Sequence, residues 1–193
     1  MKVRSFLFLV CLVSAKEIAF TSDPDTTYYE YWDFNSLVSI GSHEMTVHGN
    51  PLIISTGKGD AMHFDGIDDA VVVHDNPIGD AKEFTFEVLF RPAGGHPNIE
   101  NEPRFVCFWD PADAEGSRMT IEIRVTASGE WYFDAFLKTD AGKLTLTDAT
   151  KTHPADAWMH AAVTYSNNVF TTYVNGQQEL SGTLWLASRL GLP

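Results

Sequence analysis

Apolar and polar residues alternate with a period of two along most of the chain. The clearest segments are FTFEVLFR (84–91), RMTIEIRVTA (118–127), EWYFDAFL (130–137) and MHAAVTYS (159–166). Strict alternation is typical of antiparallel strands with one face on a packed core and the other nearer solvent. The residues expected on the packed faces are Phe84, Phe86, Val88, Phe90, Met119, Ile121, Ile123, Val125, Trp131, Phe133, Ala135, Leu137, Met159, Ala161, Val163 and Tyr165.

Turn-forming residues separate these segments at short intervals. ASGE (127–130), TDAGK (139–143), SNN (166–168) and NGQ (175–177) contain residues that tolerate the left-handed region or cap their own backbone. No amphipathic helical stretch of ten residues follows the first fifteen positions. The pattern therefore predicts an all-β, antiparallel sandwich or barrel.

The first fifteen residues, MKVRSFLFLVCLVSA, form a separate unit. They begin with Lys2 and Arg4, continue with an apolar core over 6–13, and end with small residues at Ser14 and Ala15. This layout predicts a secretory signal peptide (1–15) cleaved after Ala15, and hence a secreted protein, extracellular or periplasmic. The apolar run is too short for a membrane span, which needs about 20 residues.

The charge of the chain is strongly acidic. Loss of Lys2 and Arg4 with the signal peptide would leave 11 basic and 26 acidic residues, a net charge of −15. No run of basic residues interrupts this acidity, which argues against nucleic acid and anionic membranes as partners. Since Cys11 would also be removed, Cys107 would be the single cysteine. Its apolar neighbours in RFVCFWD predict a buried thiol.

The segment GKGDAMHFDGIDDAVVV (57–73) allows more than one interpretation. It reads most simply as two strands joined by an acidic turn, in which Asp65–Gly66 supplies a residue with positive φ and Asp68 or Asp69 accepts a backbone hydrogen bond. The alternative is a calcium site using Asp68 or Asp69, because clustered carboxylates are ligands for hard cations. The spacing does not match the twelve-residue calcium loop. A catalytic acid pair is the third option.

Four segments resemble motifs of one family, in that family's order. YEYWDFN (29–35), the 57–73 segment, FTFEVLFRP (84–92) and DAWMHAAVTYSNNVFTTYVNGQ (156–177) are similar to laminin-G-like, concanavalin A-like jelly-roll domains. The resemblance covers about residue 28 to the C-terminus. It implies a two-sheet jelly-roll sandwich over 28–193, preceded by a short lead segment (16–27), and a carbohydrate or an extracellular protein as ligand.

The chain departs from the family pattern at its end. Members usually close with another strand beside the opening strand, whereas this chain stops at GTLWLASRLGLP. Either the domain lacks that strand or the sequence is a fragment of a longer protein. The expected consequence is an open sheet edge along 28–34, through which chains could self-associate.

The motifs of the family's enzymes were not found in the sequence. No strand carries the Glu-x-Asp or Glu-x-Glu pair expected of a glycoside hydrolase, and neither Gln-x-His nor Tyr-x-Lys of the lyases occurs. Glu122 and Arg124 are interpreted as a solvated charge pair. We therefore expect a non-catalytic module. A polysaccharide-degrading enzyme and an adhesive segment of a larger surface protein are the alternatives.

Aromatic residues are the remaining candidates for a ligand site. Flat rings stack on sugar faces, and neighbouring carboxylates or amides read the hydroxyls. The weak candidates are Trp109, Asp110, Trp131 and Tyr132, with Asp68 and Asp69 for a metal. Trp109 is the best of these because it lies at a loop entry, and loops carry function more often than strands. Trp131 alternates as a core residue would.

Overall fold

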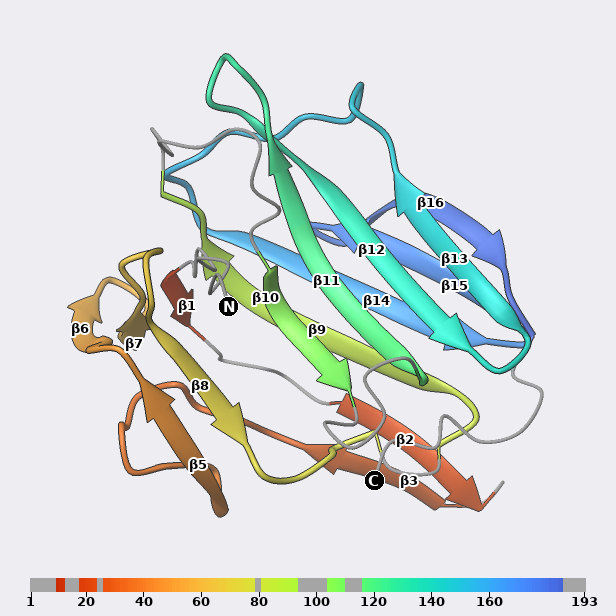
Figure 1. Cartoon of the computed structure of the whole chain (residues 1–193), viewed down its shortest axis with the longest axis horizontal. Coiled ribbons are helices and arrows are strands. Elements are labelled where there is room, and N and C mark those ends of the chain that lie inside the picture. The colour runs from red at the N-terminus through yellow and green to blue at the C-terminus, as the bar shows by residue number, and fades with distance from the viewer. Residues whose placement is uncertain are drawn as a thin grey trace.

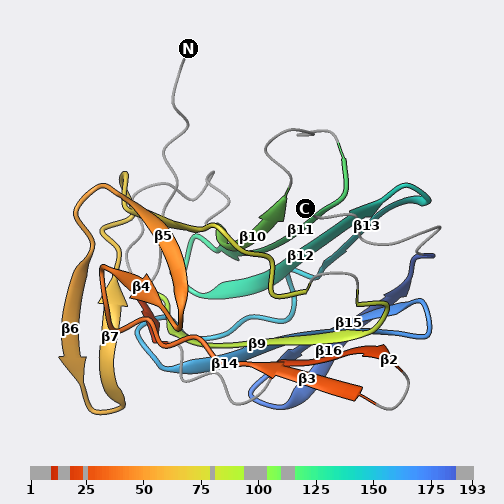
Figure 2. The ribbon, with the colours of Figure 1, turned by 90° about the horizontal axis from the view of Figure 1, so that it is seen from below.

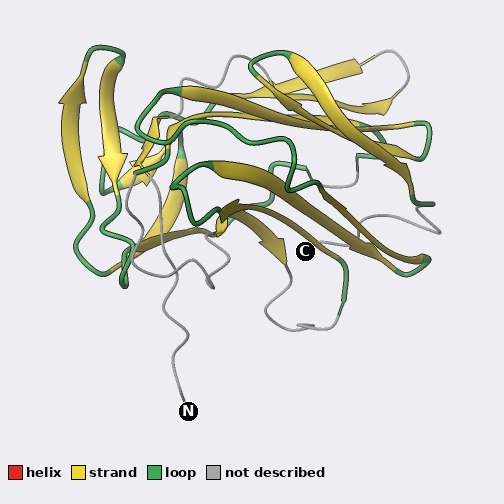
Figure 3. Cartoon of the chain, turned by 90° about the horizontal axis from the view of Figure 1, so that it is seen from above, coloured by secondary structure: helices red, strands yellow, loops and turns green. Residues whose placement is uncertain are grey.

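The computed structural model describes residues 10–12, 18–23, 26–78, 81–93, 104–109 and 116–185. Strands are the only regular elements in these ranges, so the prediction of an all-β fold is confirmed (Figure 3). The same ranges contain no helix of the length and hydropathy needed to cross a membrane.

Two main sheets pack face to face (Figure 2). The front sheet has the order β10-β11-β12-β13, and the back sheet has the order β16-β15-β14-β9-β1-β7-β6. The front-sheet strands are β10 (Arg104–Trp109), β11 (Arg118–Val125), β12 (Trp131–Thr139) and β13 (Gly142–Thr147). The back-sheet strands are β1 (Val10–Leu12), β6 (Leu52–Thr56), β7 (Gly59–His63), β9 (Phe84–Arg91), β14 (Met159–Ser166), β15 (Val169–Val174) and β16 (Gln177–Thr183).

The remaining strands lie at the margins of the sandwich. β4 (Ser39–Ile40), β5 (His43–His48) and β8 (Ala70–Val73) form a small third sheet. β2 (Ile18–Asp23) pairs with β9 and with β3 (Thr26–Glu30), and β3 pairs with β2 alone among the described strands. The opening strand β3 therefore ends at Glu30, whereas the sequence predicted a strand over 29–35. Self-association through this edge stays a prediction.

The core between the two main sheets confirms the alternation seen in the sequence. All sixteen residues expected on packed faces belong to it, and only Val125 is partly rather than fully buried. Aromatic contacts join the layers: Phe90 of β9 stacks on Phe105 of β10 at 4.7 Å and meets Trp131 of β12 edge-on at 5.3 Å between ring centroids. Such ring pairs add to the stability that burial alone provides.

β1 lies within the segment that the sequence predicts to be a signal peptide. It runs antiparallel to β9, where Val10, Cys11 and Leu12 face Arg91, Phe90 and Leu89, and it pairs with Met62 of β7 through Cys11. Cleavage after Ala15 would therefore remove the strand that joins β9 to β7. That cleavage stays a prediction.

Candidate functional site

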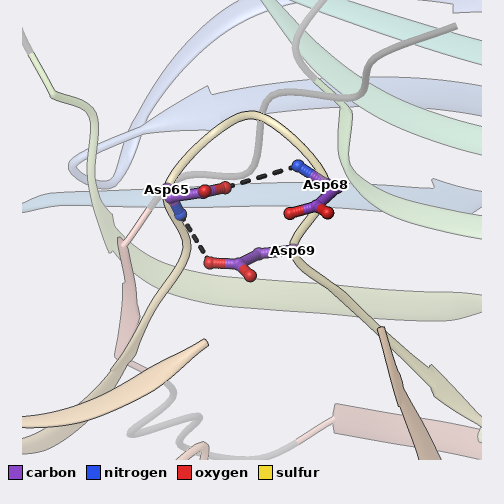
Figure 4. A group of neighbouring side chains, drawn as sticks. All are labelled: Asp65, Asp68 and Asp69. Atoms are coloured by element: carbon purple, nitrogen blue, oxygen red, sulfur yellow. Dashed lines mark hydrogen bonds between the residues drawn. The ribbon is translucent and has the colours of Figure 1, made fainter. Parts of the chain in front are cut away.

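The acidic turn after β7 is held together by its own side chains. Asp69 is buried, and its two carboxylate oxygens accept hydrogen bonds from the backbone N–H of Asn50 (2.6 Å) and of Asp65 (2.8 Å). The Asp65 carboxylate accepts from the N–H of Ile67 (2.8 Å) and of Asp68 (3.4 Å) (Figure 4). The turn joins β7 of the back sheet to β8 of the small sheet.

Two parts of the turn prediction are confirmed. Gly66 has a φ of 77°, a conformation that an L-residue with a Cβ rarely adopts. Asp69 accepts the backbone hydrogen bonds that were expected of Asp68 or Asp69. The arrangement satisfies two backbone donors with one buried carboxylate, which is the ordinary condition for burying a charged group.

The three carboxylates of Asp65, Asp68 and Asp69 bring one ligand atom each to within 4.8 Å of one another. Backbone hydrogen bonds, that from Ile67 first, lower the pKa of Asp65, so this carboxyl stays charged at mildly acidic pH. Calcium requires six to eight oxygen ligands. Both oxygens of Asp69 already accept backbone hydrogen bonds, so the burial of this carboxylate is explained without a metal ion. Calcium binding stays a prediction.

Gly49 lets the neighbouring loop approach this turn. Its φ is +68°, and a Cβ there would lie 2.3 Å from Oδ1 of Asp69 and 2.9 Å from the carbonyl oxygen of Asp68. We expect Gly49→Ala to lower the free energy of unfolding by about 2–4 kcal/mol, through left-handed strain plus overpacking. Gly129→Ala is the matched control, since Gly129 has a φ of +84° with nothing within 4 Å of the added Cβ. If urea denaturation shows the same loss of unfolding free energy for both variants, the close approach of Gly49 to Asp68 and Asp69 is contradicted.

The structure separates the aromatic candidates. Trp131 is 1% exposed and its indole N–H donates to the carbonyl of Pro154, so it is a core residue and the proposal that it binds ligand is wrong. Trp109 is 42% exposed at the end of β10. Tyr132 is partly buried on the side of β12 opposite Trp131. Asp110 lies outside the described residues.

Trp109 and Tyr132 belong to one surface, the face of the front sheet that points away from the core. Residues directly opposite each other on paired strands share a face, and the pairings assign this surface, here called the outer face. It points toward the viewer in Figure 1. Its members are Arg104, Cys107, Trp109, Arg118, Thr120, Glu122, Arg124, Tyr132, Asp134, Phe136, Lys138, Lys143, Thr145 and Thr147.

Glu122 and Asp134 lie directly opposite each other on β11 and β12. Opposite residues of an antiparallel pair have Cβ atoms about 5 Å apart. Both carboxylates are buried. Glu122 accepts a hydrogen bond from Nε of Arg104 at 3.3 Å, and Asp134 accepts one from Nε of Arg124 at 2.6 Å. The sequence interpretation of Glu122 and Arg124 as a solvated pair is therefore wrong in one respect, since Glu122 is buried and accepts a hydrogen bond from Arg104.

Basic residues gather on the same face, although no basic run exists in the sequence. The described members of the outer face include five basic and two acidic residues, a formal net charge of +3. The basic residues are Arg104, Arg118, Arg124, Lys138 and Lys143. The side chains of Arg104 and Arg124 remain 33% and 32% exposed, whereas their carboxylate partners are 7% and 3% exposed. In these two ion pairs the arginine side chain is therefore the partly exposed partner and the carboxylate is the buried one.

Aromatic rings accompany these cations. The guanidinium carbon of Arg118 lies 4.9 Å from the ring centroid of Phe136, and Arg118 is paired with Trp109 across β10 and β11. Nε of Arg118 is buried and has no hydrogen-bond partner in the described part of the chain. Cys107, opposite Thr120, is partly rather than fully buried, and this burial raises the pKa of the thiol, which disfavours the thiolate form.

Comparison with known proteins agrees with this architecture. The family model described as the concanavalin A-like lectin/glucanases superfamily matches residues 64–189, well over half of the chain. The comparison with curated proteins and that with solved structures gave no match. The matched region contains both the acidic turn and the whole outer face of the front sheet. The chain belongs to the concanavalin A-like lectin/glucanase superfamily.

Proposed function

We propose that this protein is a secreted, non-catalytic module that binds a polysaccharide on the outer face of the front sheet. The observation that carries the proposal is the combination of the exposed ring of Trp109 with polar side chains in register beside it. Exposed rings stack on the apolar faces of sugars, and nearby charged and hydroxyl groups orient the ligand through hydrogen bonds. The basic start and apolar core of residues 1–15 support secretion.

The ion pairs favour binding over catalysis. Glu122 and Asp134 each accept a hydrogen bond from an arginine whose side chain is about a third exposed. A general acid must carry a proton that it can donate to the leaving oxygen, whereas a carboxylate that accepts a charge-assisted hydrogen bond is stabilised in its charged form. These pairs instead fix the orientation of Arg104 and Arg124 at the surface.

The proposal predicts that Trp109→Ala weakens binding without destabilising the fold. We expect affinity for a bound polysaccharide to fall about tenfold or more, because truncating an aromatic anchor of a binding surface costs about 2 kcal/mol. Affinity electrophoresis or calorimetry against a polysaccharide panel measures this. The matched control is Trp185→Ala, which removes an exposed tryptophan side chain outside the front sheet. Unchanged binding by Trp109→Ala would contradict the proposed location.

A polysaccharide-degrading enzyme is the second candidate, and the opposed carboxylates favour it. A retaining glycosidase needs two carboxyl groups about 5–5.5 Å apart, and cross-strand neighbours such as Glu122 and Asp134 can meet that requirement. Release of reducing ends or unsaturated sugars from the same panel distinguishes the two functions. If the parent protein releases such products and Glu122→Gln does not, the protein is an enzyme and the proposal of a non-catalytic module is wrong.

A further inference from the structure

The strand β1 lies between two strands of the back sheet. It pairs with β9 over 89–91 on one side and with Met62 of β7 on the other, antiparallel to both (Figure 1). β7 and β9 are therefore two strand spacings apart, roughly 10 Å. Hydrolysis of the peptide bond between Ala15 and Lys16 by a signal peptidase would remove β1. It would leave a gap one strand wide between β7 and β9, here called the slot.

One side of the slot faces the main core. Directly opposite residues of paired strands share a face, and the middle position of the slot lies between Met62 and Phe90, which are both buried core residues. The ring of Phe90 also contacts Phe105 and Trp131. A residue in the middle position therefore shares its face with core side chains, where an apolar group is favoured and an unpaired charge is costly.

The other side of the slot is also largely apolar. Leu89 alternates with the buried Phe90, so it lies on the opposite face of β9, where it packs with Trp158 against Ala61. The guanidinium carbon of Arg91 lies 5.6 Å from the ring centroid of Trp158. Residues on either side of the middle position would thus meet aliphatic and aromatic groups. The surroundings of the slot favour an extended segment of apolar residues.

Loss of β1 would also open the backbone of both neighbouring strands. The edges of β7 and β9 that face the slot pair with β1 in the structure. Buried backbone N–H and C=O groups need partners, and each one left without a partner costs free energy. A strand donated by another chain supplies partners to both edges at once, which is the basis of peptide binding by strand addition.

A second copy of the chain is a poor source of that strand. A strand that enters the slot must have both of its edges free, because β7 takes one edge and β9 takes the other. Every other described strand already pairs with a strand of its own chain. A second copy would therefore have to break one of its own pairs to fill the slot, whereas an extended segment of a different protein would not.

We propose that the slot of the secreted protein binds an extended apolar segment of a partner protein, as an added strand in the place and direction of β1. This inference rests on the secretion that the proposed function includes. It adds a second binding site in the back sheet, separate from the outer face of the front sheet. Backbone hydrogen bonds provide affinity for any extended segment, and the apolar walls of the slot provide selectivity.

The experiment begins with the full sequence expressed in a secreting host, and mass spectrometry determines the N-terminus of the secreted protein. The probe is a peptide of residues 7–14 with Cys11→Ala and two added C-terminal lysines for solubility. The control peptide has Cys11→Pro instead. It is equally apolar, but it lacks the backbone N–H at the middle position and cannot form a central strand. Calorimetry and thermal unfolding measure the binding of each.

We expect the alanine peptide to bind one to one. At a hundredfold excess over its Kd it should raise the Tm by about 5–10 °C, and the proline peptide should bind at least tenfold more weakly. Equal binding of the two peptides would show adhesion without strand pairing and overturn the inference. Absence of binding would show that the slot is closed or is filled by the protein's own chain, which overturns it as well.

Cross-linking tests the register of the added strand. The protein variants are Leu89→Cys and Arg91→Cys, and the alanine peptide carries Leu12→Cys or Val10→Cys, the positions opposite them. Opposed residues have Cα atoms about 4.5–5.5 Å apart, within the range of a disulfide. Under mild oxidation we expect each matched pair to cross-link at least fivefold more than the two mixed pairs. The parent protein with the same peptides gives the background. Equal yields in all four pairs would overturn the proposed placement.

The remaining outcomes separate this inference from the proposed function. Secretion with an intact N-terminus would overturn the inference, because β1 would then fill the slot, and would leave polysaccharide binding untouched. Retention in the cell with an intact N-terminus would overturn both the inference and the secretion. A secreted oligomer that the alanine peptide dissociates would assign the slot to a second copy and overturn the partner. Peptide binding without binding to any polysaccharide would overturn the proposed ligand alone.

Discussion

Asp69→Ala is expected to lower the free energy of unfolding by about 2–5 kcal/mol, because it leaves two backbone donors without their acceptor. Asp69 is 2% exposed, and its carboxylate joins the turn at Asp65 to the loop at Asn50, which lies nineteen residues before Asp69. In a chain of this length the change corresponds to a fall in Tm of about 4–20 °C. Urea denaturation and thermal unfolding by circular dichroism measure the two quantities.

Asp68→Ala is the control, and it separates a structural turn from a calcium site. Asp68 is exposed, and its replacement by alanine removes the same charge as Asp69→Ala. If the turn is purely structural, the free energy of unfolding should change by less than about 0.5 kcal/mol. Both variants and the parent protein are unfolded in chelator and in millimolar calcium. A calcium-dependent rise in the parent's Tm that Asp68→Ala abolishes would assign the cluster to a metal. Equal losses for the two variants in chelator would contradict the structural account of Asp69.

The core could be predicted from the sequence because strand periodicity is local. In β9, each second residue from Phe84 to Phe90 is buried, and β12 and β14 repeat the pattern. Side chains alternate between the faces of a strand whatever its partner is. The buried faces were therefore identified without knowledge of the order of the strands in the sheets.

The opposed carboxylates depend instead on register between strands. The short connection from Thr126 to Glu130 pairs Val125 with Trp131, and the same register brings Glu122 opposite Asp134. The length of that turn was visible in the sequence, so this pair could have been found by extending the hairpin. A search restricted to residues two apart on one strand cannot detect carboxylates on two strands.

Other parts of the site had no local signal. Arg104 reaches Glu122 through an irregular pairing of β10 with β11, where the register shifts between Arg104 and Val106. The hydrogen bond from Asn50 to Asp69 joins segments that precede different strands in different sheets. Trp158 packs with Ala61 and Leu89 in a small cluster separate from the main core. Such contacts follow from how the sheets are placed, which periodicity does not specify.

Trp131→Ala is expected to cost about 3–5 kcal/mol, the range for truncating a fully buried aromatic residue. The ring is 1% exposed between the two sheets, where it contacts Phe90 at 5.3 Å and His153 at 4.5 Å between ring centroids. Truncation removes the burial of the indole, leaves a cavity, and frees the Pro154 carbonyl from its donor at 3.1 Å. Chemical denaturation monitored by circular dichroism measures the loss.

Two further variants, Trp131→Phe and Trp109→Ala, separate the contribution of the indole N–H hydrogen bond from that of burying the ring. The phenylalanine keeps an aromatic ring in the core and loses the N–H donor, so its cost should fall between those of the parent and of Trp131→Ala. Trp109→Ala removes the same side chain from an exposed position, with an expected change below about 1 kcal/mol. If Trp109→Ala were as destabilising as Trp131→Ala, Trp109 would be a packing residue, and the outer face would lose the ring on which the polysaccharide proposal depends.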